Sequence, residues 1–280
     1  GSELVGLIPL DAILAAGDHY LQLQGNTTGV PVKERIHTAA LSLGLDEISP
    51  FDPDEKIVEF KYRGAAGGLK GMTLTGFADE LSSESPAPGG GSIAALCGSL
   101  SAGLSAMVAG LTWSKKGMEA TRPAMQELGC KGQNLKDWFM DAVDRDTDAF
   151  NQVLAAMRLP RSSAEDKAAR TAAIEAANRF ATQIPLDVLE RSAAAADLAL
   201  AVARDGNPNS VSDAGVAGAC ALAAAEGAAM NVLINAPTLT DRTVADRMLA
   251  MQAEFLEKAQ QTAAEVRRTV YEKLAGQLPA

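Results

Sequence analysis

Histidine is nearly absent from this sequence. The 280-residue chain has only His19 and His37, both within the first forty positions. From residue 38 onward, therefore, no imidazole is present to form a catalytic triad, a histidine-ligated zinc site or an acid–base pair. Chemistry in that part of the chain has to use carboxylates, lysines, amides or the backbone.

Clusters of positive charge are also lacking. The formal net charge is −10, and the sequence has no cluster of Lys and Arg. Nucleic acids and anionic membranes are bound by concentrated positive charge, which releases their counterions. We therefore expect no nucleic acid and no membrane as partners, and a small-molecule substrate instead.

Cysteine is scarce and odd in number. The three cysteines lack the spacing of metal ligands and indicate reduced thiols in a cytosol-like compartment. Glu3 and Asp11 interrupt the short apolar start, so no signal peptide is expected there. The sequence predicts a cytoplasmic protein without a metal site. The cysteines are Cys97, Cys130 and Cys220.

Aromatic residues make up only 4% of the chain. Alanine is abundant instead, which allows helices to approach each other closely. From Thr73 onward nearly every stretch has helical periodicity, and the stretches are divided by Pro, Gly and Asn. The prediction is an all-α fold, a bundle of long helices. The expected helices span residues 75–84, 91–114, 118–158, 162–204, 210–235 and 240–276.

The first 63 residues differ from the rest. They predict two helices, over residues 9–23 and 31–45, followed by a strand over residues 56–62 with the sequence KIVEFKY. One short strand cannot form a sheet alone, so this part is interpreted as an α+β remnant of another domain. Four glycines in RGAAGGLKGM indicate a linker before the helical part. The predicted division is a remnant at 1–63, a linker at 64–72 and a helical domain at 73–280.

The segment PAPGGGSIAAL places three consecutive glycines in front of a long apolar stretch. Gly89, Gly90 and Gly91 leave backbone N–H groups open to a ligand. Ser92 stands where the N-cap or first turn of the next helix is expected, and an anionic or carbonyl-bearing ligand is stabilised at such a position. A plain glycine turn capped by the serine explains the pattern equally well.

No residue from Ser92 to Ser114 is charged, and this length is sufficient to cross a bilayer. The stretch is rich in Ser, Gly and Ala, which gain little from lipid, and its neighbours are acidic helices of soluble type, so a membrane segment is disfavoured. Small residues recur every four positions, which suits a buried bundle helix or a contact between subunits, and we expect a homodimer at least. These residues are Gly98, Ala102, Ala106 and Gly110.

Asp146 is unusual among the five aspartates of NLKDWFMDAVDRDTDAFNQVLAAM. It lies inside an apolar helical stripe, where burial penalises the charged form and raises the pKa, as a general acid requires. A buried aspartate satisfied by an arginine or a helix N-terminus is the structural alternative. The stripe consists of Leu135, Phe139, Val143, Phe150, Val153 and Met157. The other four aspartates, expected to be solvated, are Asp137, Asp141, Asp144 and Asp148.

Four further polar residues lie near predicted helix ends. Asn231 and Asn235, one turn apart, can bind an amide-rich heterocycle or satisfy backbone carbonyls where the helix ends. Arg158, at a helix C-terminus, suits the helix dipole and can also meet a substrate carboxylate. Asp213, at another helix start, is a substrate-binding candidate whose default role is capping.

The loop SPAPGGGS at residues 85–92, followed in order by VDRDTDAF, AMRLP and NVLIN, resembles the formimidoyltetrahydrofolate cyclodeaminases, of the cyclodeaminase/cyclohydrolase type. The resemblance covers about residues 73–276. Before it, GSELVGLIPLDAIL and LGLDEISPFDPDEKIVEF resemble the final segment of glutamate formimidoyltransferase, which is fused to the cyclodeaminase in some organisms. The greater part of the transferase, including its catalytic histidine region, has no counterpart here, so transferase activity is not implied.

The resemblance implies conversion of 5-formimidoyltetrahydrofolate to 5,10-methenyltetrahydrofolate and ammonia, with no metal or organic cofactor. In that reaction the folate N10 attacks the formimidoyl carbon, and a protonated group helps ammonia to leave. We assign the proton to Asp146, with Asp144 as the second candidate. Arg158 is expected at the glutamate tail of the substrate. The substrate-binding candidates are Gly89, Gly90, Gly91, Ser92, Arg158, Asp213, Asn231 and Asn235.

Two other functions fit the same sequence. Related domains act as methenyltetrahydrofolate cyclohydrolases, which open the same ring with water. The helical domain also fits a non-catalytic oligomerisation module, which thermal stabilisation by folate would contradict. In either enzymatic case we expect a homodimer or higher homo-oligomer, with the site completed across subunits.

Overall fold

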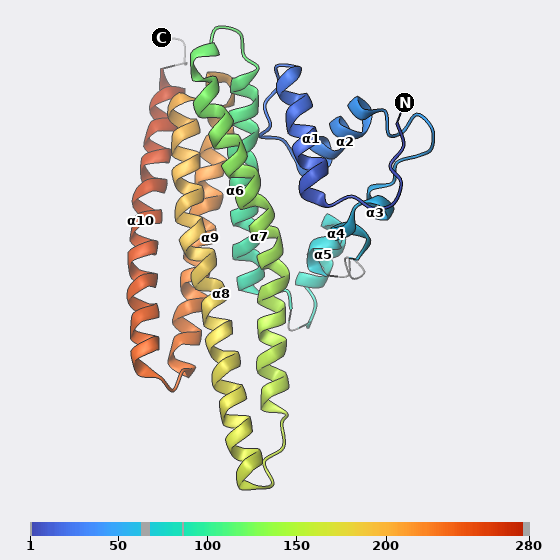
Figure 1. Cartoon of the computed structure of the whole chain (residues 1–280). Coiled ribbons are helices and arrows are strands. Elements are labelled where there is room, and N and C mark those ends of the chain that lie inside the picture. The colour runs from blue at the N-terminus through green and yellow to red at the C-terminus, as the bar shows by residue number, and fades with distance from the viewer. Residues whose placement is uncertain (1, 63–67, 86, 277–280) are drawn as a thin grey trace.

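Long helices form a bundle in the computed structural model of the chain (Figure 1). The structure describes residues 2–62, 68–85 and 87–276. The predicted all-α bundle is confirmed, and the long helices lie within a few residues of their expected bounds. They are α6 (Gly90–Trp113), α7 (Arg122–Met157), α8 (Ala164–Asp205), α9 (Val211–Asn235) and α10 (Arg242–Ala275).

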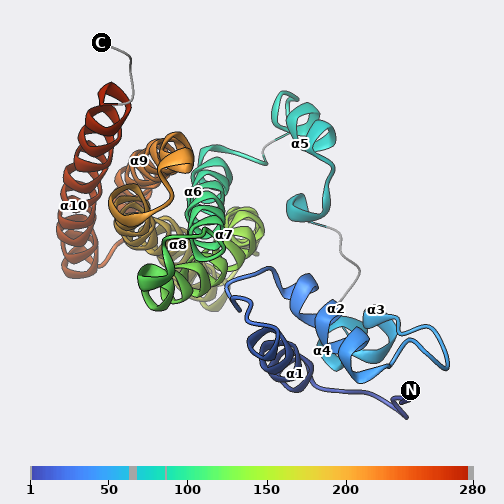
Figure 2. The same cartoon turned by 90° about the horizontal axis from the view of Figure 1, so that it is seen from above.

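Helix α6 contacts α7, α8 and α9, while α10 packs on the outer side of α8 and α9 (Figure 2). The core consists mainly of alanines, with Phe139 as its largest fully buried side chain. A Cβ at Gly98 would lie 2.5 Å from the Phe139 ring, so glycine is required for α7 to approach α6 at this point.

The small-residue stripe of α6 is used within the chain. Ala102 and Ala106 are buried and face Gly132 of α7. A Cβ at Gly132 would lie 2.9 Å from both the Ala102 carbonyl oxygen and the Ala106 Cβ. Of the two roles predicted for the stripe, the structure therefore shows the buried bundle contact, and the stripe gives no support to a subunit contact.

The hairpin of α7 and α8 extends beyond the other helices (Figure 1). Phe150 and Met157 lie on this extension and are 40% and 49% exposed. Their predicted burial is wrong because α6 begins at Gly90, beside Asp146, and cannot cover the later turns of α7. The apolar stripe is buried only where α6 runs alongside it.

The first 62 residues contain the two predicted helices, α1 (Leu10–Leu23) and α2 (Val32–Leu43). The predicted strand over 56–62 is wrong. Two short helices, α3 (Pro53–Lys56) and α4 (Val58–Lys61), occupy that region, and one isolated parallel bridge joins Ile8 to Ile57. A strand needs a partner along its length, and here the chain offers the bridge at Ile8 alone, so this part is helical rather than α+β in the described residues.

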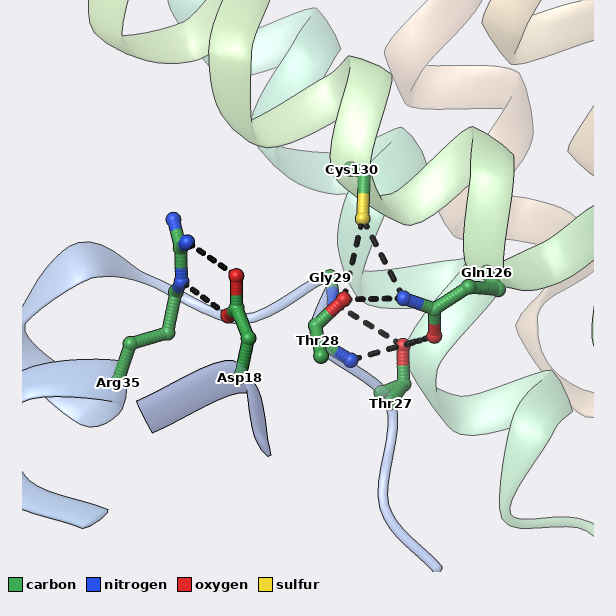
Figure 3. Close-up of polar contacts among 7 residues, drawn as sticks. All are labelled: Asp18, Thr27, Thr28, Gly29, Arg35, Gln126 and Cys130. Carbon is green, nitrogen blue, oxygen red and sulfur yellow. Dashed lines mark hydrogen bonds and ion pairs between the residues drawn. The ribbon is translucent and has the colours of Figure 1, made fainter. Parts of the chain in front are cut away.

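A polar contact joins the loop between α1 and α2 to helix α7 (Figure 3). Gln126 accepts hydrogen bonds from the Thr27 hydroxyl at 2.6 Å and the Thr28 N–H at 3.2 Å. Gly29 lies so close to Gly129 that a Cβ on Gly29 would be 2.9 Å from the Gly129 backbone. Residues 2–62, which have a small apolar core of their own, are thereby packed onto the bundle.

Part of the predicted linker is bound to the bundle. Its residues 64–67 lie outside the described part of the chain, its residues Leu69–Gly71 form the 3₁₀ turn η1, and helix α5 (Leu74–Leu81) follows it. The Leu69 side chain is buried in the main core. The Lys70 amine pairs with Asp141 at 2.6 Å, so this segment is attached to α7.

Two helical stretches are long and apolar enough to cross a membrane by length and composition. They are Gly90–Trp113, which is α6, and Pro208–Thr238, which contains α9. Both contribute buried residues to the bundle, and α6 and α9 contact each other along their length. Packing of this kind also makes the core helices of bundles apolar.

Candidate functional site

The three glycines lead directly into helix α6. Gly89 is the N-cap, in an extended conformation, and its carbonyl accepts the Ile93 N–H at 3.1 Å. Gly90 and Gly91 form the first turn together with Ser92, which is fully buried. Ser92 therefore occupies the first turn rather than the N-cap, and its side chain points toward α7.

Asp146 of α7 meets this helix start. The Ser92 hydroxyl lies 3.0 Å from Asp146 Oδ2 and 3.2 Å from the Val143 carbonyl oxygen, within donating distance of both. A Cβ at Gly91 would lie 2.2 Å from Asp146 Oδ1. The carboxyl group thus occupies space that any side chain at position 91 would take, at the positive end of α6.

Burial raises the pKa of Asp146 above its ordinary value. Hydrogen bonds from the Ser92 hydroxyl and backbone N–H act in the opposite direction, because they stabilise the charged form, but burial is the larger effect. This is the direction expected of an acid that holds a proton at higher pH than a solvated aspartate. The geometry also matches the structural alternative, in which the carboxyl group satisfies the N-terminus of a neighbouring helix.

Asn231 lies beside the glycine loop. Its Nδ2 atom is 3.7 Å from the position that a Cβ would take at Gly90, and it donates a hydrogen bond to the Gly227 carbonyl at 2.8 Å. The side chain is only partly buried, so its amide oxygen and second N–H remain available for a ligand. The structure brings Asn231, the glycine loop and Asp146 to the same end of α6.

Asn235 has a different role. It donates a hydrogen bond to the Ala181 carbonyl of α8 at 2.8 Å. Pro185 lies four residues later inside α8 and has no N–H to give to that carbonyl. Asn235 therefore supplies the donor that the proline removes, which is a structural function and not the ligand contact we predicted.

Replacing Asn235 with Ala should destabilise the protein by about 1–3 kcal/mol, because the Ala181 carbonyl loses its donor. The free energy of unfolding in urea measures this loss. In a Pro185→Ala background the α8 backbone can satisfy Ala181 itself, so the same change should then cost much less. An equal loss of stability in both backgrounds would refute the assignment of Asn235 as the donor that replaces the missing N–H of Pro185.

Asp144 lies on another face of α7. It accepts a hydrogen bond from the Lys70 N–H at 3.3 Å, and a Cβ at Gly68 would be 2.6 Å from its Oδ2. Its side chain is only 23% exposed, so the prediction of a solvated Asp144 is wrong. Asp144 lines a groove of about 640 Å³ between α7 and residues 68–72, together with Thr147, Asp148 and Asn151.

Two predicted binding residues lie elsewhere in the chain. Arg158 follows α7 on the extended hairpin, twelve residues and about 18 Å along the helix axis from Asp146. Asp213 lies in the first turn of α9, eighteen residues and about 27 Å from Asn231 at its other end. Within one chain neither residue reaches the start of α6.

Sequence reasoning missed two features of this region. The first is the steric role of Gly91, which we predicted only as a donor of backbone N–H groups. The second is Lys70 in the presumed linker, whose position beside Asp141 and Asp144 had no signal beyond a single positive charge. Among the described residues, no group of three or more His, Cys, Asp or Glu side chains is arranged to hold a metal ion.

Both parts of the chain match models of known protein families. A family model described as formiminotransferase-cyclodeaminase matches residues 73–254, and one described as formiminotransferase domain matches residues 1–63. Formiminotetrahydrofolate cyclodeaminase from Thermotoga maritima, a solved structure, is 28% identical with a TM-score of 0.62, covering 73% of this chain and 96% of that one.

Several curated relatives are similar in sequence. The formimidoyltransferase-cyclodeaminases of Rattus norvegicus and Sus scrofa are 32% and 34% identical over 266 residues, which is 94% of this chain and 49% of each relative. The methenyltetrahydrofolate cyclohydrolase of Methylorubrum extorquens is 39% identical over 177 residues, 63% of this chain and 85% of that protein. The chain spans about half the length of the bifunctional relatives that it matches. Because the family model covers more than half of its residues, the chain belongs to the formiminotransferase-cyclodeaminase family.

Proposed function

We propose that the chain is a formimidoyltetrahydrofolate cyclodeaminase, which converts 5-formimidoyltetrahydrofolate to 5,10-methenyltetrahydrofolate and ammonia. The observation that carries the proposal is the position of Asp146, a half-buried carboxyl group with a raised pKa at the N-terminus of α6. Family membership and the similarity to the solved cyclodeaminase support the choice of reaction.

The chemistry requires a proton at one point. The folate N10 forms a bond to the formimidoyl carbon and loses its proton, and the bond from that carbon to the amino nitrogen then breaks. Ammonia is a far better leaving group than the amide anion, so a proton has to reach the nitrogen as the bond breaks. Asp146 is the donor in this proposal, and Asp144 remains the second candidate.

The substrate would bind over the start of α6. The backbone N–H groups of Gly89, the N-cap, and of Gly90 and Gly91 lie at the N-terminus of α6, where the four initial N–H groups of a helix lack partners within the helix. The Asn231 amide, beside Gly90, is placed to hydrogen-bond the pterin. No metal or organic cofactor enters this proposal, because the substrate supplies its own nucleophile.

An assay for ammonia release from 5-formimidoyltetrahydrofolate, followed together with the absorbance of the methenyl product, tests the proposal. Equal amounts of ammonia and methenyltetrahydrofolate are expected. Purified protein that binds the substrate and releases no ammonia would refute the cyclodeaminase function.

The second candidate function is methenyltetrahydrofolate cyclohydrolase. The 39% identity to a cyclohydrolase of this name exceeds the 32% and 34% to the bifunctional relatives, although it covers a smaller part of the chain. In this reaction water adds to the methenyl carbon and the ring opens. Loss of the absorbance of methenyltetrahydrofolate in the absence of ammonia would identify this activity.

We also propose that a second copy of the chain covers the face formed by α6 and α9. The two helices lie side by side, α6 has no charged residue, and α9 has only Asp213 and Glu226. A helix face with exposed large apolar side chains and few charges is typical of a subunit interface. Its exposed large side chains are Leu100, Met107, Leu111, Val216, Met230, Leu233 and Ile234.

The oligomeric state tests this face. Light scattering at micromolar concentration should give at least twice the mass of one chain for the unaltered protein. The double variant Leu100→Glu with Ile234→Glu should give monomers, because each charge would be buried without a partner in the interface. An unaltered protein that is monomeric would exclude the interface.

A further inference from the structure

The Ser92 hydroxyl is hydrogen-bonded within the protein itself. It is fully buried and lies between two acceptors, Asp146 Oδ2 at 3.0 Å and the Val143 carbonyl oxygen at 3.2 Å. Both acceptors belong to α7, so the hydroxyl is held against α7. Its hydrogen is therefore used within the protein and not by a ligand.

The two carboxyl oxygens of Asp146 have different surroundings. Oδ2 lies within hydrogen-bond distance of the Ser92 hydroxyl, whereas Oδ1 lies over Gly91, 2.2 Å from the position a Cβ would take there. A serine hydroxyl has one hydrogen, and a charge-assisted bond to a carboxylate is the stronger of its two choices. The Ser92 backbone N–H also acts on this carboxyl group, so both hydrogen bonds that hold it come from one residue in the first turn of α6.

We propose that Ser92 is a positioning residue for Asp146, holding Oδ2 by its hydroxyl so that the carboxyl group stays over Gly91 and delivers its proton there. The inference rests on the proposed function in so far as Asp146 is the acid. It assigns Ser92 to the orientation of the acid instead of to substrate binding.

Few other charges act on this carboxyl group. Helix α6 has no charged residue, and its only titratable side chain is Cys97. On α7 the neighbouring Asp144 is bound by the Lys70 N–H, and Arg145 lies over the Trp138 ring. On α9 Glu226 bonds Gln260 of α10, and on α8 Glu175 accepts the Thr240 N–H. Burial and the two Ser92 hydrogen bonds are the causes that act on Asp146.

The test is the titration of Asp146 by NMR in protein labelled with ¹³C at aspartate carboxyl groups, with Asp146→Asn to assign its signal. In Ser92→Ala the pKa of Asp146 should rise, because a donor that stabilises the charged form is lost. Ser101→Ala is the matched control. Ser101 is also a fully buried serine of α6, and its hydroxyl has no hydrogen-bond partner among the described residues.

Ammonia release is measured on the same variants. Ser92→Ala should lower kcat between about 10-fold and 100-fold, as expected when a reacting group is misplaced by about 1 Å. The high-pH limb of its pH profile should move in the same direction as the titration, and Ser101→Ala should leave both unchanged. Ser92→Cys, similar in size and a weaker donor, should show a smaller shift in the same direction.

The titration decides the inference independently of turnover. An Asp146 that titrates in Ser92→Ala and Ser92→Cys as it does in the unaltered protein would overturn it. If the unaltered protein released no ammonia while the titration shifted as expected, the proposed function would fail and the hydrogen bond between Ser92 and Asp146 would stand.

Discussion

Asp146→Asn is expected to lower ammonia release by about 10²- to 10⁴-fold, the usual contribution of a general acid. The amide oxygen of asparagine can still accept the Ser92 hydrogen bond, so the contact at the start of α6 is preserved. The amide nitrogen has no acidic proton to give to the leaving ammonia. Steady-state ammonia release and the free energy of unfolding in urea, measured together, separate this loss from a loss of folding.

Three comparisons make this expectation specific. Asp148→Asn, an exposed aspartate two residues later on α7, should retain full activity. Asp144→Asn should retain most of it if Asp146 is the acid, and a larger loss in Asp144→Asn than in Asp146→Asn would reverse the two assignments. A stable, fully active Asp146→Asn would mean that the carboxyl group only satisfies the N-terminus of α6.

The pH dependence follows from the same group. A general acid acts in its protonated form, and burial raises the pKa of Asp146. Activity should therefore decline as the pH rises through that pKa and persist to higher pH than a solvated aspartate would allow. The decline should disappear from the residual activity of Asp146→Asn, which has no carboxyl group to titrate at this position.

The bundle was predictable from sequence because its signals are local. Helical periodicity and breaks at Pro and Gly set the bounds of α6 to α10, and the position of Asp146 inside an apolar stripe predicted its burial. The expectations for Phe150 and Met157 failed because the stripe continues beyond the place where α6 begins. Periodicity gives the face of a helix but does not show how far the neighbouring helix extends.

The roles of the two asparagines depend on contacts between distant segments. Asn231 and Asn235 share one face of α9, yet Asn231 lies beside Gly90 whereas Asn235 donates a hydrogen bond to the Ala181 carbonyl of α8. Only the pairing of α9 with α8 brings Asn235 opposite the carbonyl that Pro185 leaves without a donor. For the same reason the strand predicted over residues 56–62 failed, since strand formation depends on a partner that local sequence does not reveal.

Gly91→Ala should lower ammonia release by about 100-fold while the protein stays folded. The new Cβ would lie 2.2 Å from Asp146 Oδ1 and 2.6 Å from its Cγ, so the carboxyl group has to move. It can do so by rotating its side chain, and alanine favours the helix by about 1 kcal/mol over glycine. Stability is therefore expected to change little, whereas a displacement of about 1 Å at a reacting group can cost 10²-fold in rate.

Gly103→Ala is the matched control on the same helix, because its Cβ would meet only Lys136 Cγ, at 3.9 Å; it should retain full activity. The double variant Gly91→Ala with Asp146→Asn shows how Gly91 acts. If the glycine is needed only to admit the carboxyl group, the double variant should be no slower than Asp146→Asn alone. A further loss equal to that of Gly91→Ala alone would instead assign Gly91 a separate contact with the substrate, through its backbone N–H.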